Sequence, residues 1–138
     1  MSVRSQTRQL GNFTQFEHVN LRVPDHRLAT LFFVQGLGFT RDPTRMVGVN
    51  NMWVNAGLQQ FHLPIGEAHP FAGEIGLTVP DLDTLAHSLK QIAGELKGTR
   101  FAVRKTAATL QIDSPWGHRF RAHPVSYTHL TLPTIYSV

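Results

Sequence analysis

The sequence predicts an α+β fold made of two tandem βαβββ modules. The first observation behind this prediction is an internal repeat, because His18-Val-Asn-Leu-Arg-Val-Pro-Asp25 returns as Glu74-Ile-Gly-Leu-Thr-Val-Pro-Asp81. The second observation is that each copy alternates apolar and polar residues and then enters a stretch with helical periodicity. A duplicated module indicates a pseudo-symmetric fold with a site between its halves.

The first module is expected to begin with a strand over 16–23, where apolar residues occupy one face and polar residues the other. Pro24 ends this strand, and Asp25 is placed to cap the N-terminus of the following helix. The helix is expected to close at Gly36-Leu37-Gly38, because glycine tolerates a left-handed cap. Turn-forming residues then separate three short strands, expected near 39–47, 51–55 and 58–64.

The second module repeats this order. Its first strand is expected over 74–79, followed by a helix with an apolar stripe at Leu82, Leu85, Leu89, Ile92 and Leu96. Strands are expected near 100–105, 108–112 and 118–123, and Asp113-Ser-Pro-Trp-Gly117 is expected to form a turn. Module 1 is therefore assigned to about 13–67 and module 2 to about 72–124.

The two ends of the chain are assigned to neither module. Residues 1–12 are polar and lack periodicity, so they are interpreted as a leader. Residues 125–138 have no counterpart in the first module, and the run Ser126-Tyr-Thr-His-Leu-Thr-Leu-Pro-Thr134 looks like a cloning adaptor read through rather than native sequence.

Composition narrows the class of protein. The chain is 41% hydrophobic and 16% charged, which is typical of a globular domain, and no apolar run is long enough to span a membrane. Because cysteine is absent, any metal must be held by nitrogen or oxygen ligands. The net charge of +4 is scattered along the chain, which argues against a nucleic-acid interface and favours small anionic ligands. A cytoplasmic location is the default expectation.

Polar side chains gather on one face of the first and the last strand of each module. The strand alternation places them opposite the apolar face that the helices would cover. This face contains His18, Asn20, Arg22, Gln60, His62, Glu74, Thr78, Arg119, Arg121 and His123. Such a face is either a binding site or simply a solvated side of a sheet.

This pattern resembles the vicinal-oxygen-chelate superfamily, which includes glyoxalase I, extradiol dioxygenases and the fosfomycin and bleomycin resistance proteins. The resemblance covers about residues 13–124 and rests on the segment from His18 to Asp25, on Phe33 through Phe39, and on the Asp113–Gly117 turn. It implies a curved mixed sheet with the helices on its convex side and a site on the concave face. It also implies a homodimer, in some relatives with modules exchanged between chains.

The resemblance further implies four ligand positions, which fall here on His18, His62, Glu74 and Arg121. The first three side chains can bind a metal, whereas Arg121 cannot, because its guanidinium has no lone pair to donate. Two histidines and one carboxylate suit a divalent metal such as Fe, Mn, Ni, Co or Zn. The implied function is metal-dependent lyase, isomerase or dioxygenase chemistry on a small anionic substrate, with Glu74 and Arg121 as catalytic residues.

Substrate contacts are expected from Asn20, Arg22, Trp53, Gln60 and Arg121. An alternative uses the same residues without a metal, because Glu74 and Arg121 occupy positions that meet at one site and can form an ion pair instead. The protein would then bind or sequester a small molecule, as the bleomycin-binding relatives do. A scaffold with a functionless polar face is the third reading.

The remaining histidines carry weaker expectations. His123 shares the polar face and is a fallback metal ligand. His118 follows the Asp113–Gly117 turn and is expected to be structural. His26 and His87 lie on the expected helices and are expected to be exposed.

Overall fold

The structure is a computed structural model in which residues 11–45 and 48–125 are described. The expected leader and tail therefore lie almost wholly outside the described residues. Within this described part, the helices are all too short or too polar to cross a membrane.

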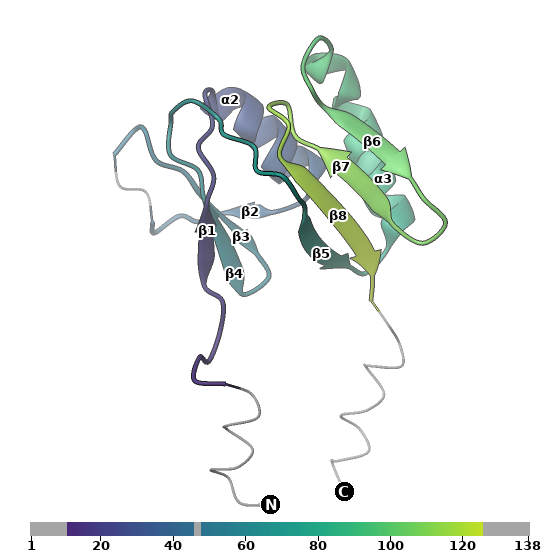
Figure 1. Cartoon of the computed structure of the whole chain (residues 1–138). Helices are drawn as coiled ribbons and strands as arrows, with labels where there is room; N and C mark the ends of the chain where they lie inside the picture. The colour runs from purple at the N-terminus through teal and green to yellow at the C-terminus, as the bar shows by residue number, and fades with distance from the viewer. Residues whose placement is uncertain (1–10, 46–47, 126–138) are drawn as a thin grey trace, which may run out of the picture.

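Each module has the predicted order of elements (Figure 1). Module 1 contains β1 (His18–Asn20), α2 (His26–Ala29), the π-helix η1 (Thr30–Gly36), β2 (Thr40–Arg41), β3 (Trp53–Ala56) and β4 (Gln59–His62). Module 2 contains β5 (Ile75–Val79), α3 (Leu82–Ile92), the 3-10 helix η2 (Ala93–Leu96), β6 (Ala102–Lys105), β7 (Leu110–Asp113) and β8 (Arg119–Pro124).

The strands form two four-stranded mixed sheets, in the orders β1-β4-β3-β2 and β5-β8-β7-β6. In each sheet the first pair is parallel and the other pairs are antiparallel. The two parallel pairs have matching registers. Asn20 and Gly76 are equivalent positions of the repeat, and Asn20 lies opposite His62 in the first sheet while Gly76 lies opposite Arg121 in the second. The register therefore confirms that the repeat seen in the sequence is a structural duplication.

The repeated Val-Pro-Asp segment ends a strand and begins a helix in both modules. The carboxylate of Asp25 accepts hydrogen bonds from the backbone N–H groups of Arg27 and Leu28, at 2.7 and 3.2 Å. Asp81 caps α3 in the same way, through the N–H groups of Asp83 and Thr84. These bonds satisfy donors that the first turn of a helix leaves without partners.

The expected strand over 39–47 is wrong in length, because β2 contains only Thr40 and Arg41. The carboxylate of Asp42 accepts hydrogen bonds from the backbone N–H groups of Thr44 and Arg45 and from the Thr44 hydroxyl. This side chain-to-backbone turn competes with strand pairing and leads the chain out of the sheet. The first helix also departs from regular α geometry, since the backbone N–H of Leu37 bonds to the Phe32 carbonyl.

The two modules share one hydrophobic core. The Phe33 ring of module 1 lies 6.2 Å from the Phe61 ring and 6.0 Å from the Phe120 ring of module 2, measured between ring centroids. The helices α2 and α3 lie behind the sheets in Figure 1, and α3 packs against η1. Four positions of the predicted α3 stripe are buried, namely Leu85, Leu89, Ile92 and Leu96.

Candidate functional site

The predicted site residues fall into two groups, one on each sheet. His18 and His62 belong to the first sheet, whereas Glu74 precedes β5 and Arg121 lies on β8 of the second sheet. The structure thus brings the predicted residues together in pairs within modules.

The first group is built around Trp53. The His62 ring stacks on the Trp53 ring with centroids 4.2 Å apart, and the His18 ring meets the same tryptophan edge-on at 5.0 Å. The Arg45 guanidinium lies 5.0 Å from the Trp53 ring centroid, a cation–π distance. Cross-strand register explains this cluster, because Trp53 lies opposite His62 in the β3–β4 pair.

Both ring nitrogens of His62 lie beside amide side chains. Nδ1 is 3.1 Å from the side-chain oxygen of Asn20, and Nε2 is 2.9 Å from that of Asn51. Burial and the charge of nearby His18 lower the pKa of His62. The ring is therefore neutral near pH 7 and donates one N–H, so one of the two amides must turn its NH₂ group to the other nitrogen.

Gln60 lies on the same face and is held by two acceptors. Its amide nitrogen donates to Asp42 and to Asn55, each at 2.6 Å. Hydrogen bonds from the backbone and hydroxyl of Thr44 lower the pKa of Asp42 to about 2. Gln60 is therefore fixed as part of a polar network that ends in a carboxylate.

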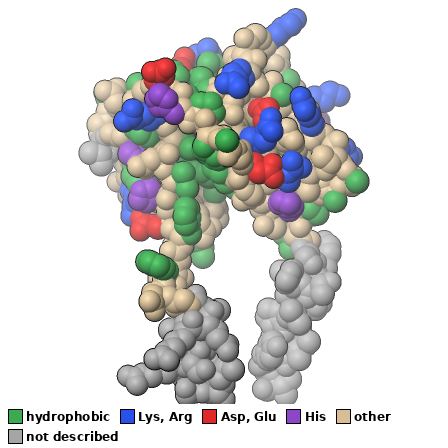
Figure 2. Space-filling view, in the orientation of Figure 1, with side chains coloured by type: hydrophobic (Ala, Val, Ile, Leu, Met, Phe, Trp, Pro, Cys, Tyr) green, Lys and Arg blue, Asp and Glu red, His purple; other side chains and the backbone are tan. Residues whose placement is uncertain are grey.

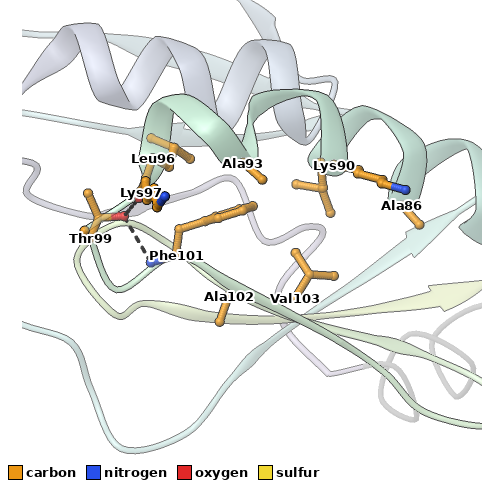
Figure 3. A pocket seen from close by; sticks show the side chains of 11 residues that line it. Ala86, Lys90, Ala93, Leu96, Lys97, Thr99, Phe101, Ala102 and Val103 are labelled. Carbon is orange, nitrogen blue, oxygen red and sulfur yellow. Dashed lines mark hydrogen bonds between the residues drawn. The ribbon is translucent and has the colours of Figure 1, made fainter.

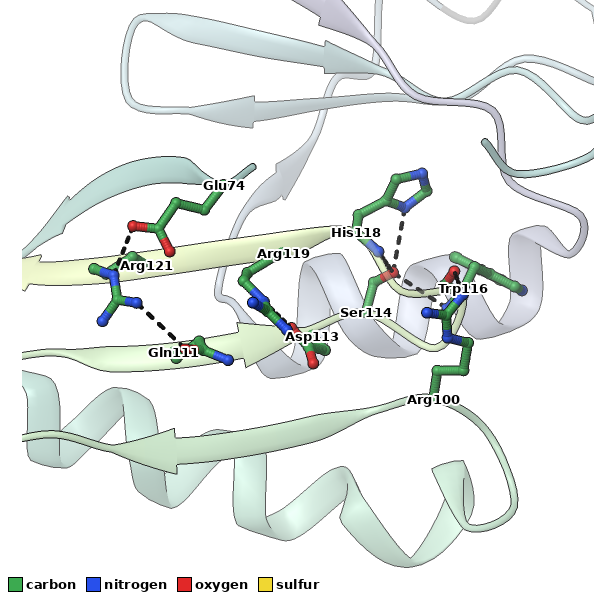
Figure 4. Close-up of polar contacts among 9 residues, drawn as sticks. All are labelled: Glu74, Arg100, Gln111, Asp113, Ser114, Trp116, His118, Arg119 and Arg121. Carbon is green, nitrogen blue, oxygen red and sulfur yellow. Dashed lines mark hydrogen bonds and ion pairs between the residues drawn. The ribbon is translucent and has the colours of Figure 1, made fainter. Parts of the chain in front are cut away.

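The second group is an ion pair between Glu74 and Arg121 (Figure 4). The Arg121 Nε donates to the Glu74 carboxylate at 2.7 Å, while Nη1 donates to Thr109 and Nη2 to Gln111. The hydrogen bond from Arg121 lowers the pKa of Glu74, and Glu74 in turn raises the pKa of Arg121. The side chains are 37% and 24% exposed, so the pair is open to a ligand.

A second ion pair extends this polar face. The Arg119 Nε donates to the Asp113 carboxylate at 3.0 Å, across the β7–β8 pair. His123 is exposed on the same strand, and its charge contributes to the lowered pKa of Glu74. The second sheet thus presents two ion pairs and an exposed histidine on one face.

Three of the weaker histidine expectations have an outcome in the structure, and the exposure of His87 on α3 is confirmed. His118 is buried, and its backbone N–H donates to the Ser114 hydroxyl oxygen at 3.0 Å, as expected for a structural role. The expectation that His26 is exposed is wrong. Its Nε2 donates to the Leu63 carbonyl at 2.7 Å, which ties α2 to the end of β4.

The donor set does not fit a divalent metal in this arrangement. Glu74 is bound to Arg121, and both nitrogens of His62 face amides. Among the described residues, no three His, Asp or Glu side chains are grouped closely enough to hold a metal ion. The assignment of His18, His62 and Glu74 as metal ligands stays a prediction.

The expected substrate-binding residues do not all lie together. Asn20, Trp53 and Gln60 share the polar face of the first sheet. Arg22 lies beyond the end of β1, where it is exposed and its side chain packs beside Gly66. Residues that sequence reasoning missed are Asp42, Asn51, Asn55, Thr109 and Gln111. The signal for three of these is strand alternation, which places Asn51 and Asn55 with Trp53, and Gln111 with the polar face of β7.

The chain matches no family model and no curated protein. Among solved structures it resembles the fosfomycin resistance protein FosX from Mesorhizobium loti, with a TM-score of 0.65 and 14% identity over 87% of this chain and 98% of that chain. It also resembles a glyoxalase/bleomycin resistance protein/dioxygenase family enzyme from Burkholderia phytofirmans, with a TM-score of 0.60 and 15% identity over 80% and 98% of the two chains.

A third similar structure is FosX from Listeria monocytogenes, with a TM-score of 0.64 and 12% identity over 83% of this chain and 94% of that chain. At these identities the likeness is one of fold. The chain has the fold of the vicinal-oxygen-chelate superfamily, as the sequence resemblance implied. Fold alone does not fix the chemistry, so function must be argued from the side chains.

Proposed function

We propose that this protein binds a small anionic molecule with a flat or apolar part, without a metal, at a site completed by a second copy of the chain. The observation that carries this proposal is the ion pair between Glu74 and Arg121, which occupies the carboxylate that a metal would need. The proposal thus favours a binding or sequestering protein over a metal-dependent enzyme.

The anionic group is assigned to Arg121. A guanidinium has five N–H donors, and the contacts with Glu74, Thr109 and Gln111 use three of them. One N–H on each terminal nitrogen is left for ligand oxygens, in a planar geometry that suits a carboxylate or phosphate. Glu74 and Gln111 hold the guanidinium in place, so the ligand does not have to order it.

The flat or apolar part is assigned to Trp53. The tryptophan is held by His62 on its face and by His18 at its edge, so its ring is rigid. A ligand ring that stacks on Trp53 would displace the exposed Arg45 guanidinium, which lies 5.0 Å from the Trp53 ring centroid. Asn20 lies beside His62, and Gln60 lies beside Asn55 on the same polar face. Their side-chain amides supply hydrogen-bonding groups for orientation.

A homodimer is proposed because the two groups lie on different sheets of one chain. A second copy that faces the first would place the Trp53 group of one chain opposite the Arg121 group of the other. Apolar surface suitable for such a contact lies next to β1, where Phe13 and Phe16 are 91% and 65% exposed. Phe16 also lines a groove of about 300 Å³ that Val19 and Ile75 share between the modules.

The test is binding of phenyl phosphate, which joins an aromatic ring to an anionic group. Thermal stability should rise with phenyl phosphate concentration, equally with and without EDTA. Arg121→Met should abolish this shift, and Trp53→Leu should weaken it. Arg27→Met is the matched control, because Arg27 is exposed on the helix α2 and belongs to neither group, so its replacement should leave the shift unchanged. Fosfomycin and bleomycin are then the first natural candidates, from the names of the similar structures.

Metal-dependent chemistry remains the second candidate, and the observation in its favour is that His18 and His62 contact the same Trp53 ring. It requires Glu74 to leave Arg121. Stoichiometric Mn²⁺ or Zn²⁺ in the purified protein, lost in His18→Ala, together with binding that EDTA abolishes, would replace the proposal by this candidate. Size-exclusion chromatography with light scattering tests the dimer separately, and a monomer would remove the shared site.

A further inference from the structure

The outer edge of the second sheet carries two features that belong to neither half of the proposed site. One is a groove of about 510 Å³ between the helical segment α3–η2 and the strand β6 (Figure 3). The other is the free edge of β6, which ends the strand order β5-β8-β7-β6 and pairs with no further strand among residues 11–45 and 48–125. From these features we infer that this edge binds an extended acidic peptide of a partner protein, which adds to the sheet as a strand.

The groove has an apolar interior and a basic rim. Figure 3 shows the side chains of Phe101 and Val103 pointing from the β6 segment toward the helix, whereas Ala102 points away. The helix contributes Ala93, a small side chain that leaves the space open, and Val103 is 37% exposed. An apolar side chain that enters this groove would be removed from water on both sides.

The free edge of β6 can be assigned atom by atom. The Arg100 N–H donates to the Pro115 carbonyl, and the Thr106 N–H donates to the Thr109 carbonyl. Antiparallel pairing alternates along a strand, so residues 102 and 104 of β6 face β7 in the same way. Val103 and Lys105 therefore present their backbone N–H and C=O groups outward, where an added strand would pair with them.

Charge selects the kind of peptide. Lys90 and Lys97 line the groove, and among the described residues no carboxylate lies within ion-pair distance of either. Arg104 is exposed on the opposite face of β6, where side chains of an added strand would lie beside it. In Figure 2, Lys and Arg side chains follow the β6 side of the molecule. A strand with apolar residues toward the groove and acidic residues toward Arg104 fills the groove and pairs with Arg104, while Lys90 and Lys97 attract its net negative charge at longer range.

A second copy of this chain is a poor occupant of the same edge. Two β6 strands paired about a two-fold axis would bring Arg104 and Lys105 close to the same residues of the partner. Asp83 binds Lys105 at 3.8 Å, whereas none of the carboxylates in the described part of the chain forms an ion pair with Arg104. The like charges that oppose self-association favour an acidic strand from another protein.

The probe is a hexapeptide of alternating valine and glutamate, acetylated and amidated at its ends and labelled with a fluorophore. Fluorescence anisotropy with the full chain should show saturable binding that weakens with salt. The peptide of alternating valine and lysine should not bind. The valine–glutamate peptide with N-methyl groups on its valines should also fail. In an antiparallel strand a valine lies opposite Val103, and its methylated nitrogen cannot donate to the Val103 carbonyl.

Variants of the protein separate the two features. Val103→Pro removes one outward N–H and leaves the β7 ladder intact, so binding should fall roughly five- to tenfold, while Val103→Thr should bind like the parent protein. Ala93→Phe fills the groove and should abolish binding. Gln91→Phe is its matched control, because Gln91 is exposed on α3 and does not line the groove.

The outcomes that overturn the inference are specific. Equal binding of the valine–lysine or N-methylated peptide would mean that pairing with β6 does not occur. No saturable binding of the valine–glutamate peptide would mean that the basic residues only protect the sheet edge. Arg121→Met should leave peptide binding unchanged, so that this inference and the small-molecule proposal stand or fall separately.

Discussion

His118 is the buried titratable side chain whose environment is most completely defined. It is 1% exposed, and its Nδ1 lies 3.2 Å from the Ser114 hydroxyl in the turn that precedes β8. Burial, and secondarily the charge of Arg100, lower the pKa of His118 from its usual 6.5. The folded protein therefore resists protonation of this ring, whereas the unfolded chain does not.

Stability is expected to fall as the pH drops below about 6.5, because the unfolded state then takes up a proton that the folded state excludes. Above that pH both states are neutral at His118, and the contribution is flat. Melting temperatures measured from about pH 8 to pH 5 should decline less in His118→Asn, which keeps a hydrogen-bonding amide without a titrating ring. An unchanged slope in this variant would assign the pH dependence elsewhere, with His62 as the next residue to test.

At the residue scale, strand alternation placed the candidate site residues on the polar faces of their strands but left two alternatives for Glu74 and Arg121. Alternation was sufficient to put His62 and Arg121 on the polar sides of their strands. It was not sufficient to distinguish an ion pair between Glu74 and Arg121 from a metal ligand, because that difference lies in side-chain rotamers. The partners Thr109 and Gln111 depend on cross-strand register, which is fixed only when the strands pair.

At the scale of elements, the repeated Val-Pro-Asp segment accounts for the accuracy of the predicted order. Proline ends the strand, and the aspartate that follows begins the helix in each module. β2 and η1 were predicted less well, because their geometry depends on the Asp42 turn and on packing against α3. The end of β2 is thus set by a local turn that the strand pattern did not reveal, whereas the geometry of η1 depends on a tertiary contact with α3.

The cap of the first helix offers a direct test of this argument. Asp25→Ala should lower the free energy of unfolding by about 1 kcal/mol, because two backbone N–H groups lose their acceptor. Asp25→Asn keeps a side-chain oxygen at the same position and should recover most of the loss. Urea denaturation of the three proteins measures both effects, and equal losses in the two variants would mean that the negative charge rather than the cap matters.

The close packing of η1 on α3 rests on Gly36. A Cβ atom at this position would lie 2.5 Å from Cδ1 of Ile92 and 3.2 Å from Cδ2 of Leu89. Both of these side chains are buried, so they have little room to move aside. The glycine at position 36 therefore allows the close approach of the two helices and does not serve an unusual backbone angle.

Gly36→Ala is expected to destabilise the protein by about 1–3 kcal/mol through overpacking. Ile92→Val removes the Cδ1 atom that the new methyl group would meet, so the same substitution should cost less in the Ile92→Val background. A double-mutant cycle by chemical denaturation measures this coupling. Additive losses would show that the helices separate instead of colliding at Ile92.

At the scale of the whole molecule, the duplication is expected to produce one cooperative unit rather than two. The Phe33 ring packs near Phe61 of its own module and Phe120 of the other, so the two modules share the centre of the core. This differs from the placement of polar residues, which remain divided between the two sheets. The fold joins the modules through apolar packing and leaves their polar faces available for other partners.

The two tryptophans provide a test of this cooperativity, because Trp53 lies on β3 of module 1 and Trp116 in the turn before β8 of module 2. In Trp116→Phe only module 1 is reported by fluorescence, and in Trp53→Phe only module 2. Each variant has its own stability, so circular dichroism of the same variant provides the reference. Fluorescence and circular dichroism should give coincident urea transitions in both variants.

Phe33→Leu, added to either tryptophan variant, should lower the fluorescence and the circular dichroism midpoints together, because it loosens the shared core. The free energy of unfolding should fall by about 1–3 kcal/mol. A fluorescence transition that separates from the circular dichroism transition would mean that the modules unfold independently, and that the phenylalanine contacts do not couple them.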